Sequence, residues 1–78
     1  MEERNWLDEL KELKIKNPFS HLEIEWFESQ IALYHVWGDY TVPVNINTVI
    51  CFMFFIGRIS GDEVLQIRKI IRKGLENG

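Results

Sequence analysis

Eight consecutive apolar residues, Val49 to Ile56, constrain the fold of this chain more than any other feature. A segment without a polar face is expected to be covered on all sides. In a chain of 78 residues, such a place exists only at the centre of one core. The run is also far shorter than the ~20 residues that cross a bilayer. We therefore interpret it as the buried centre of a single domain, residues 1–78, and not as a membrane span.

The composition predicts a folded protein of a reducing compartment. Hydrophobic residues make up 46% of the chain and aromatic residues 13%, which disfavours intrinsic disorder. The one cysteine, Cys51, has no partner for an internal disulfide and lies inside the apolar run, where a small buried hydrophobe is expected. The first residues lack the basic-then-apolar order of a signal peptide. We expect a soluble cytoplasmic protein that does not contact a membrane.

Two helical patterns precede the apolar run. In Asn5–Ile15, apolar residues recur at spacings of three and four between charged residues. Ser20–Trp37 opens on a Ser-x-x-Glu capping box, and Gly38 can end this helix in the left-handed conformation. Pro18 separates the two segments, because the residue before a proline avoids helical geometry.

A β-hairpin is the rival interpretation of the middle of the chain. Residues 31–37 and 40–46 are rich in strand formers and flank Gly38-Asp39, a pair suited to a two-residue turn. With residues 49–56 as a third strand, the alternative fold is α+β, in which a helix at each end packs on a small antiparallel sheet. We prefer the helix, and we interpret residues 38–46 as a loop.

Three local rules agree on a helix–helix junction after the apolar run. Gly57 can take the left-handed position that ends one helix. Ser60 can cap the next helix in a second capping box with Glu63, and Ile59 can pack on Val64 as a hydrophobic staple. The sequence therefore predicts an all-α fold of four helices. The third helix is fully buried and forms an αα-hairpin with the fourth, residues 61–75.

The charges divide unevenly along the chain, whose formal net charge is −3. The first half is acidic, and four cations lie on the outward face of the last helix. This stripe is a candidate site for an anion or an acidic partner: Arg68, Lys69, Arg72 and Lys73. Nucleic-acid binding through the same stripe is the alternative function, although nucleic-acid-binding domains usually carry a clear basic excess.

No group of residues points to catalysis, a cofactor or a metal. Glu23, Glu25 and Glu28 could serve as acid–base carboxylates, but no apolar surroundings are predicted that would raise a pKa. His21 and His35 are too far apart along the helix for one site, and no cysteine pair accompanies them. We expect no enzyme activity.

Aromatic residues are the remaining candidates for function, because a domain of this size cannot bury all of them. Trp37 and Tyr40 flank the Gly38-Asp39 turn, and we predict that they form an exposed patch with Trp6, with His35 beside them. The patch would bind another protein chain. The predicted function is thus a small non-enzymatic interaction module, a regulator or inhibitor that binds a larger protein or associates with itself.

Overall fold

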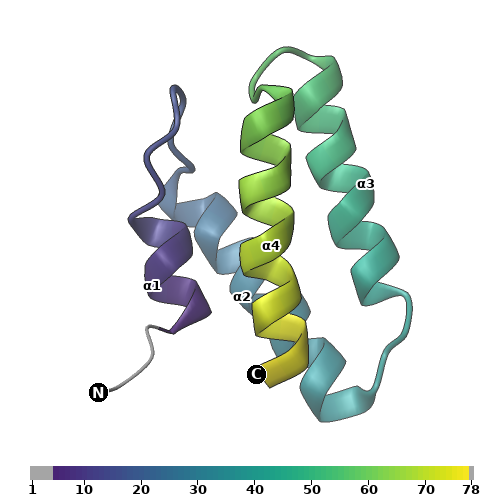
Figure 1. Cartoon of the computed structure of the whole chain (residues 1–78). Helices are drawn as coiled ribbons and strands as arrows, with labels where there is room; N and C mark the ends of the chain where they lie inside the picture. Colours follow the sequence, from purple (N-terminus) through teal and green to yellow (C-terminus); the bar gives the residue numbers. More distant parts are fainter. Residues whose placement is uncertain (1–4, 78) are drawn as a thin grey trace.

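The computed structural model describes residues 5–77, which form four helices and no strand (Figure 1). The helices are α1 (Trp6–Lys11), α2 (His21–Trp37), α3 (Val42–Phe55) and α4 (Gly61–Asn77). The all-α prediction is confirmed, and the alternative with a sheet is wrong. Residues 31–37 form the end of α2, and residues 42–46 form the start of α3.

The ends of α2 follow the sequence rules. Ser20 accepts a hydrogen bond through its side chain from the backbone N–H of Glu23, and the Glu23 carboxylate accepts from the backbone N–H of Ser20. This reciprocal pair satisfies two of the N–H groups that an α-helix leaves free at its start. Gly38 ends the helix at φ 64°, a conformation that glycine adopts without a steric penalty.

The third helix begins earlier than predicted, at Val42, so the predicted loop 38–46 is five residues too long at its C-terminal side. Asp39 organises the short connection, because its Oδ1 accepts from the backbone N–H and the hydroxyl of Thr41 at 2.9 and 2.6 Å. Pro43 lies in the first turn of α3, where the missing N–H costs nothing and the fixed φ favours the helix. Pro43 therefore starts a helix here and does not interrupt one.

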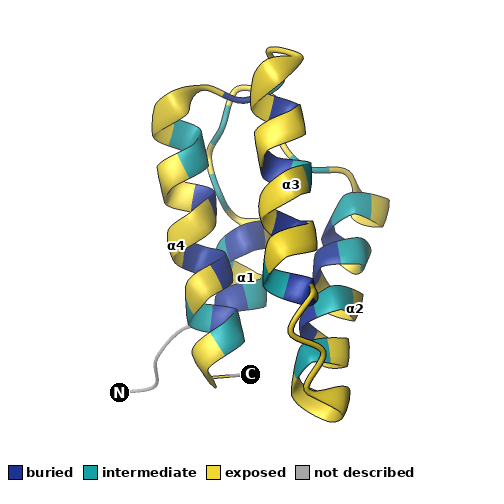
Figure 2. Cartoon of the chain, turned by 90° about the vertical axis from the view of Figure 1, so that its right-hand side faces the viewer, coloured by how far each residue is buried: buried dark blue, intermediate teal, exposed yellow. Residues whose placement is uncertain are grey.

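The prediction that the third helix is fully buried is wrong. α3 contacts α2 and α4 but not α1, so its outer side has no cover within residues 5–77. It buries Val42, Ile46, Ile50 and Met53. The part of α3 that faces the viewer in Figure 2 is mostly exposed. The predicted burial of Cys51 is also wrong, because this residue is exposed.

Two of the three predicted features of the junction between α3 and α4 are confirmed, and the packing of Ile59 on Val64 stays a prediction. Gly57 has φ 78°, its N–H donates to Phe54 O, and the N–H of Arg58 donates to Met53 O. These two bonds define a Schellman motif. Ser60 and Glu63 exchange side-chain-to-backbone hydrogen bonds of 2.8 and 3.3 Å, so the second capping box is present.

The segment between α1 and α2 is extended, and α1 ends at Lys11, four residues before the predicted Ile15. The first turn of α4 and the backbone of the α3–α4 junction bind this segment. Glu63 accepts from the backbone N–H of Lys16 at 2.9 Å, and the Asn17 side chain donates to Arg58 O at 3.1 Å. These long-range bonds attach Lys16 and Asn17, just beyond the predicted end of the helix, to the α3–α4 junction.

One core joins all four helices. It includes residues of α1 and α2, the inner side of α3, Ile59 of the junction, and Ile67, Ile70 and Ile71 of α4. α4 extends to Asn77, two residues beyond the predicted end at residue 75, and Gly74 lies buried inside it. Among residues 5–77, no helix combines the length and hydropathy needed to cross a membrane.

Candidate functional site

The outer side of α3 carries the largest group of exposed apolar side chains on one element. Phe55 is 84% exposed and Phe52 is 62% exposed. We call this group the α3 apolar face: Val44, Cys51, Phe52, Phe54, Phe55 and Ile56.

Helical spacing makes the C-terminal part of this face continuous. Phe55 lies three and four residues after Phe52 and Cys51, and residues at these spacings are neighbours on a helix surface. The rings of Phe54 and Phe55 are 6.2 Å apart between centroids. α3 contains no acidic or basic residue, so no charge of its own interrupts the face.

Two of the predicted partner-binding residues lie exposed next to the N-terminal end of α3. Trp37 is 77% exposed and Tyr40 is 83% exposed, as the prediction of an uncovered turn requires. The Tyr40 ring contacts that of Tyr34 edge-on at 6.4 Å. Whether these rings bind a partner stays a prediction.

The predicted exposure of Trp6 is wrong, because only 8% of this residue is accessible. Its indole packs over Gly74 of α4. A Cβ built on Gly74 would lie 2.8 Å from Trp6 Cδ2 and 2.9 Å from Ile31 Cδ1. Because Gly74 has no side chain, the indole of Trp6 can pack directly against α4.

His35 is exposed and its ring contacts Tyr34, but its side chain also reaches α4. Its Nε2 is 2.8 Å from Gly74 O, and because a carbonyl can only accept, this nitrogen carries the proton. His35 and Trp6 line one shallow hollow between α1 and α2. The four predicted partner-binding residues thus divide into two groups, Trp37 with Tyr40 and Trp6 with His35.

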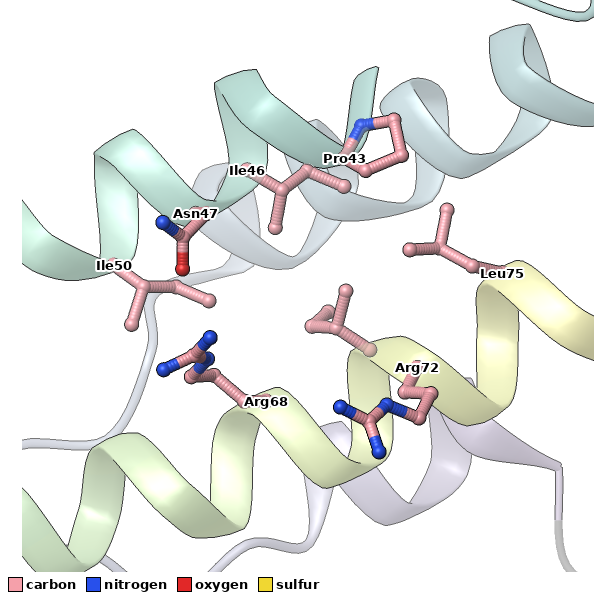
Figure 3. A pocket seen from close by; sticks show the side chains of 8 residues that line it. Pro43, Ile46, Asn47, Ile50, Arg68, Arg72 and Leu75 are labelled. Carbon is pink, nitrogen blue, oxygen red and sulfur yellow. The ribbon is translucent and has the colours of Figure 1, made fainter. Parts of the chain in front are cut away.

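A groove lies between α3 and α4 along one edge of the α3 apolar face (Figure 3). Its volume is about 220 Å³. Side chains of Ile46, Ile50 and Ile71 line it, with Pro43 and Leu75 at one end. The polar groups at its edges are the Asn47 amide and the guanidinium groups of Arg68 and Arg72, which Figure 3 shows beside the groove.

The predicted four-cation stripe is divided between two sides of α4. Arg68 and Arg72 line the α3–α4 groove, whereas Lys69 and Lys73 line a hollow on the side of α1. Lys73 forms an ion pair with Glu9 at 2.7 Å. Anion binding by all four residues stays untested, but one ligand on one face would meet only two of them.

One of the three candidate carboxylates, Glu23, stabilises the fold. Glu23 forms a two-pronged ion pair with Arg58, whose second nitrogen donates to Glu23 Oε1 at 2.6 Å. These hydrogen bonds lower the pKa of Glu23 to about 2, so it is ionised at neutral pH and cannot act as a proton donor. Glu25 lies 2.9 Å from His21 on the exposed first turn of α2. In the described part of the chain, no three His, Cys, Asp or Glu side chains converge as metal ligands would.

Sequence reasoning missed the α3 apolar face, although the eight-residue apolar run contains most of it. The run was assigned to the interior because it lacks polar residues. The pattern that marks only one side as core is the four-residue spacing of Val42, Ile46 and Ile50, which continues into the run from outside it.

Comparisons of this chain with protein-family models, with curated proteins and with solved structures found no match.

Proposed function

We propose that this protein is a non-enzymatic interaction module that binds another protein through the α3 apolar face. The observation that supports this proposal is an uncharged helix with six exposed apolar residues on its outer side and at its end, in a chain of 78 residues. Exposed apolar groups of this kind mark interaction surfaces in proteins that otherwise cover their core.

The chemistry of the face suits a protein partner. Phe52 and Phe55 are large and rigid, and fully burying such a side chain stabilises a complex by about 1.5–3 kcal/mol. Aromatic residues are enriched at the centres of interfaces, and charged residues are depleted there. Trp37 and Tyr40 are further exposed aromatic residues near the other end of α3.

The proposed mode of action is masking. A regulator or inhibitor of this kind covers a surface of a larger partner, and the fold needs no rearrangement because the face is already exposed. We place this activity in the cytoplasm, in keeping with the unpaired Cys51, which is compatible with a reducing compartment.

Affinity capture from the native host tests the proposal. The wild-type protein is compared with a Phe52→Ser/Phe55→Ser variant and with Val36→Ser as a control. Val36 is 70% exposed, but it lines the hollow between α1 and α2. We expect a defined protein to be captured by the wild type and the control and to be lost with the double variant. Equal capture by all three proteins would refute the proposed surface.

Self-association through the same face is the second form of the proposal, and it has its own measurement. Sedimentation equilibrium of the wild type would show a dimer that the Phe52→Ser/Phe55→Ser variant does not form. A monomer at all concentrations would restrict the proposal to a different partner chain.

A further inference from the structure

We infer that the α3–α4 groove binds an acidic amphipathic segment of another protein. A carboxylate of the segment binds Arg68 and Arg72, and an apolar side chain of the same segment packs against Pro43 and Leu75, above the buried Ile46, Ile50 and Ile71 that form the floor of the groove. The inference rests on the proposed function, since the groove borders the α3 apolar face and would hold one edge of the same partner.

The arginines of the groove lack counterions within the described part of the chain. Arg58 and Lys73 each pair with a glutamate, whereas neither Arg68 nor Arg72 forms an ion pair within residues 5–77. The two arginines are four residues apart, so they are neighbours on one side of α4. Guanidinium groups bind carboxylates through two parallel hydrogen bonds, and two unpaired groups together favour an anionic ligand.

The size and lining of the groove suit a peptide segment. Its volume of about 220 Å³ lies below the roughly 300–1,000 Å³ of pockets that hold free small molecules. It suits one or two side chains of a peptide. A second hollow of about 130 Å³, lined by Cys51, Phe54, Gly61 and Val64, continues along the same two helices. An extended or helical segment could therefore occupy both.

The charges around the groove favour a different protein as the occupant. A second copy that docks α3 on α3 would bring two more arginines and no carboxylate from its own α3. A bilayer with anionic lipids offers matching charge, but its headgroups place no apolar side chain in the groove. A different protein with acidic residues beside an apolar stripe satisfies both the charge and the lining.

A peptide selection tests this inference directly. Random 16-residue peptides displayed on phage are selected on the immobilised wild-type protein, and the most enriched peptides are synthesised. Their Kd values are measured for the wild type, for Arg68→Gln/Arg72→Gln and for Phe52→Ser/Phe55→Ser. The variant Lys11→Gln/Lys69→Gln is the control, because it removes the same charge from exposed positions outside the groove.

The inference predicts peptides with an Asp or Glu beside aliphatic or aromatic residues. Their affinity falls about tenfold or more in Arg68→Gln/Arg72→Gln and stays within about twofold in the control. Higher salt weakens binding to the wild type but has little effect on the arginine variant.

Three results would overturn the inference. Binding that depends on Phe52 and Phe55 but not on the arginines would leave the proposed function standing and reject the acidic segment. Failure to select any peptide would reject the groove as a peptide site. Arginine-dependent binding to vesicles of phosphatidylglycerol and phosphatidylcholine, without such peptides, would assign the two arginines to lipid headgroups.

Discussion

The indole of Trp6 occupies the place that a side chain at position 74 would fill. A Cβ on Gly74 would lie 2.8 and 3.0 Å from two atoms of this ring. The Gly74 carbonyl also accepts the hydrogen bond from His35. One glycine therefore brings α1, α2 and α4 together on the side of the molecule away from α3.

Gly74→Ala is expected to destabilise the protein although alanine favours helices. The better helix propensity contributes about 1 kcal/mol, and overpacking against Trp6 and Ile31 costs about 1–3 kcal/mol. We expect a net loss of about 1 kcal/mol in the free energy of unfolding, measured with urea. Gly61→Ala is the control, because nothing lies within 4 Å of its added Cβ. A gain in stability from both substitutions would contradict the close packing.

The Glu23–Arg58 pair is expected to make stability depend on pH in the acid range. The folded-state pKa of Glu23 is lowered from 4.5 to about 2. Its contribution is therefore complete above about pH 4.5 and is lost as the pH falls through 2. Because the pair lies near solvent, we expect a contribution of about 1–2 kcal/mol. Urea unfolding at several pH values should show this loss in the wild type and not in Glu23→Gln. If the free energy of unfolding changes with pH by the same amount in both proteins, the Glu23–Arg58 pair does not stabilise the fold.

The α3–α4 junction is expected to be sensitive to conformation at Gly57. Gly57→Ala places a Cβ at φ 78° in open space, so its cost of about 1 kcal/mol is one of backbone conformation alone. Thermal unfolding should show a Tm lower by about 4–8 °C. An unchanged Tm would mean that the left-handed turn is not maintained in solution.

Ser60→Ala tests the second capping box, because it removes the acceptor for the Glu63 N–H. The loss should be about 1 kcal/mol, which denaturant unfolding can resolve. Ser29→Ala, on an exposed part of α2, is the control and should change little. Similar values for both variants would argue that the cap does not stabilise α4.

The helix ends and turns in the structure show which features the sequence could predict. Caps and glycine turns depend on residues within a few positions, and the capping boxes at Ser20 and Ser60 and the turns at Gly38 and Gly57 were all predicted correctly. Burial depends on which elements lie on each side of a helix. α1 makes no contact with α3, and Phe55 is exposed. The apolar run alone does not show this, because the four-residue spacing that marks the buried side begins outside the run, at Val42 and Ile46.

The division of the four cations of α4 between two sides also depends on which helices pack beside α4. Neighbouring positions such as Arg68 and Lys69 differ by about 100° around a helix, so they meet different neighbours when helices pack on both sides. Only the placement of α1 and α3 shows that Arg72 borders an apolar groove while Lys73 reaches Glu9.

The two sides of α3 should respond differently to substitution. Ile50→Ala removes a fully buried side chain and should cost about 2–5 kcal/mol, whereas Phe55→Ser should cost less than about 0.5 kcal/mol. Urea unfolding of the monomer measures both. Comparable losses would mean that the apolar run is enclosed on all sides.

Photo-crosslinking from the centre of the α3 apolar face tests the central claim most directly. A photoreactive phenylalanine analogue replaces Phe55 in one protein and Val36 in another, and both are irradiated in the native host. Our account predicts a crosslink from position 55 to a defined protein and none from position 36. A crosslink from position 36 alone, or none from position 55, would contradict it.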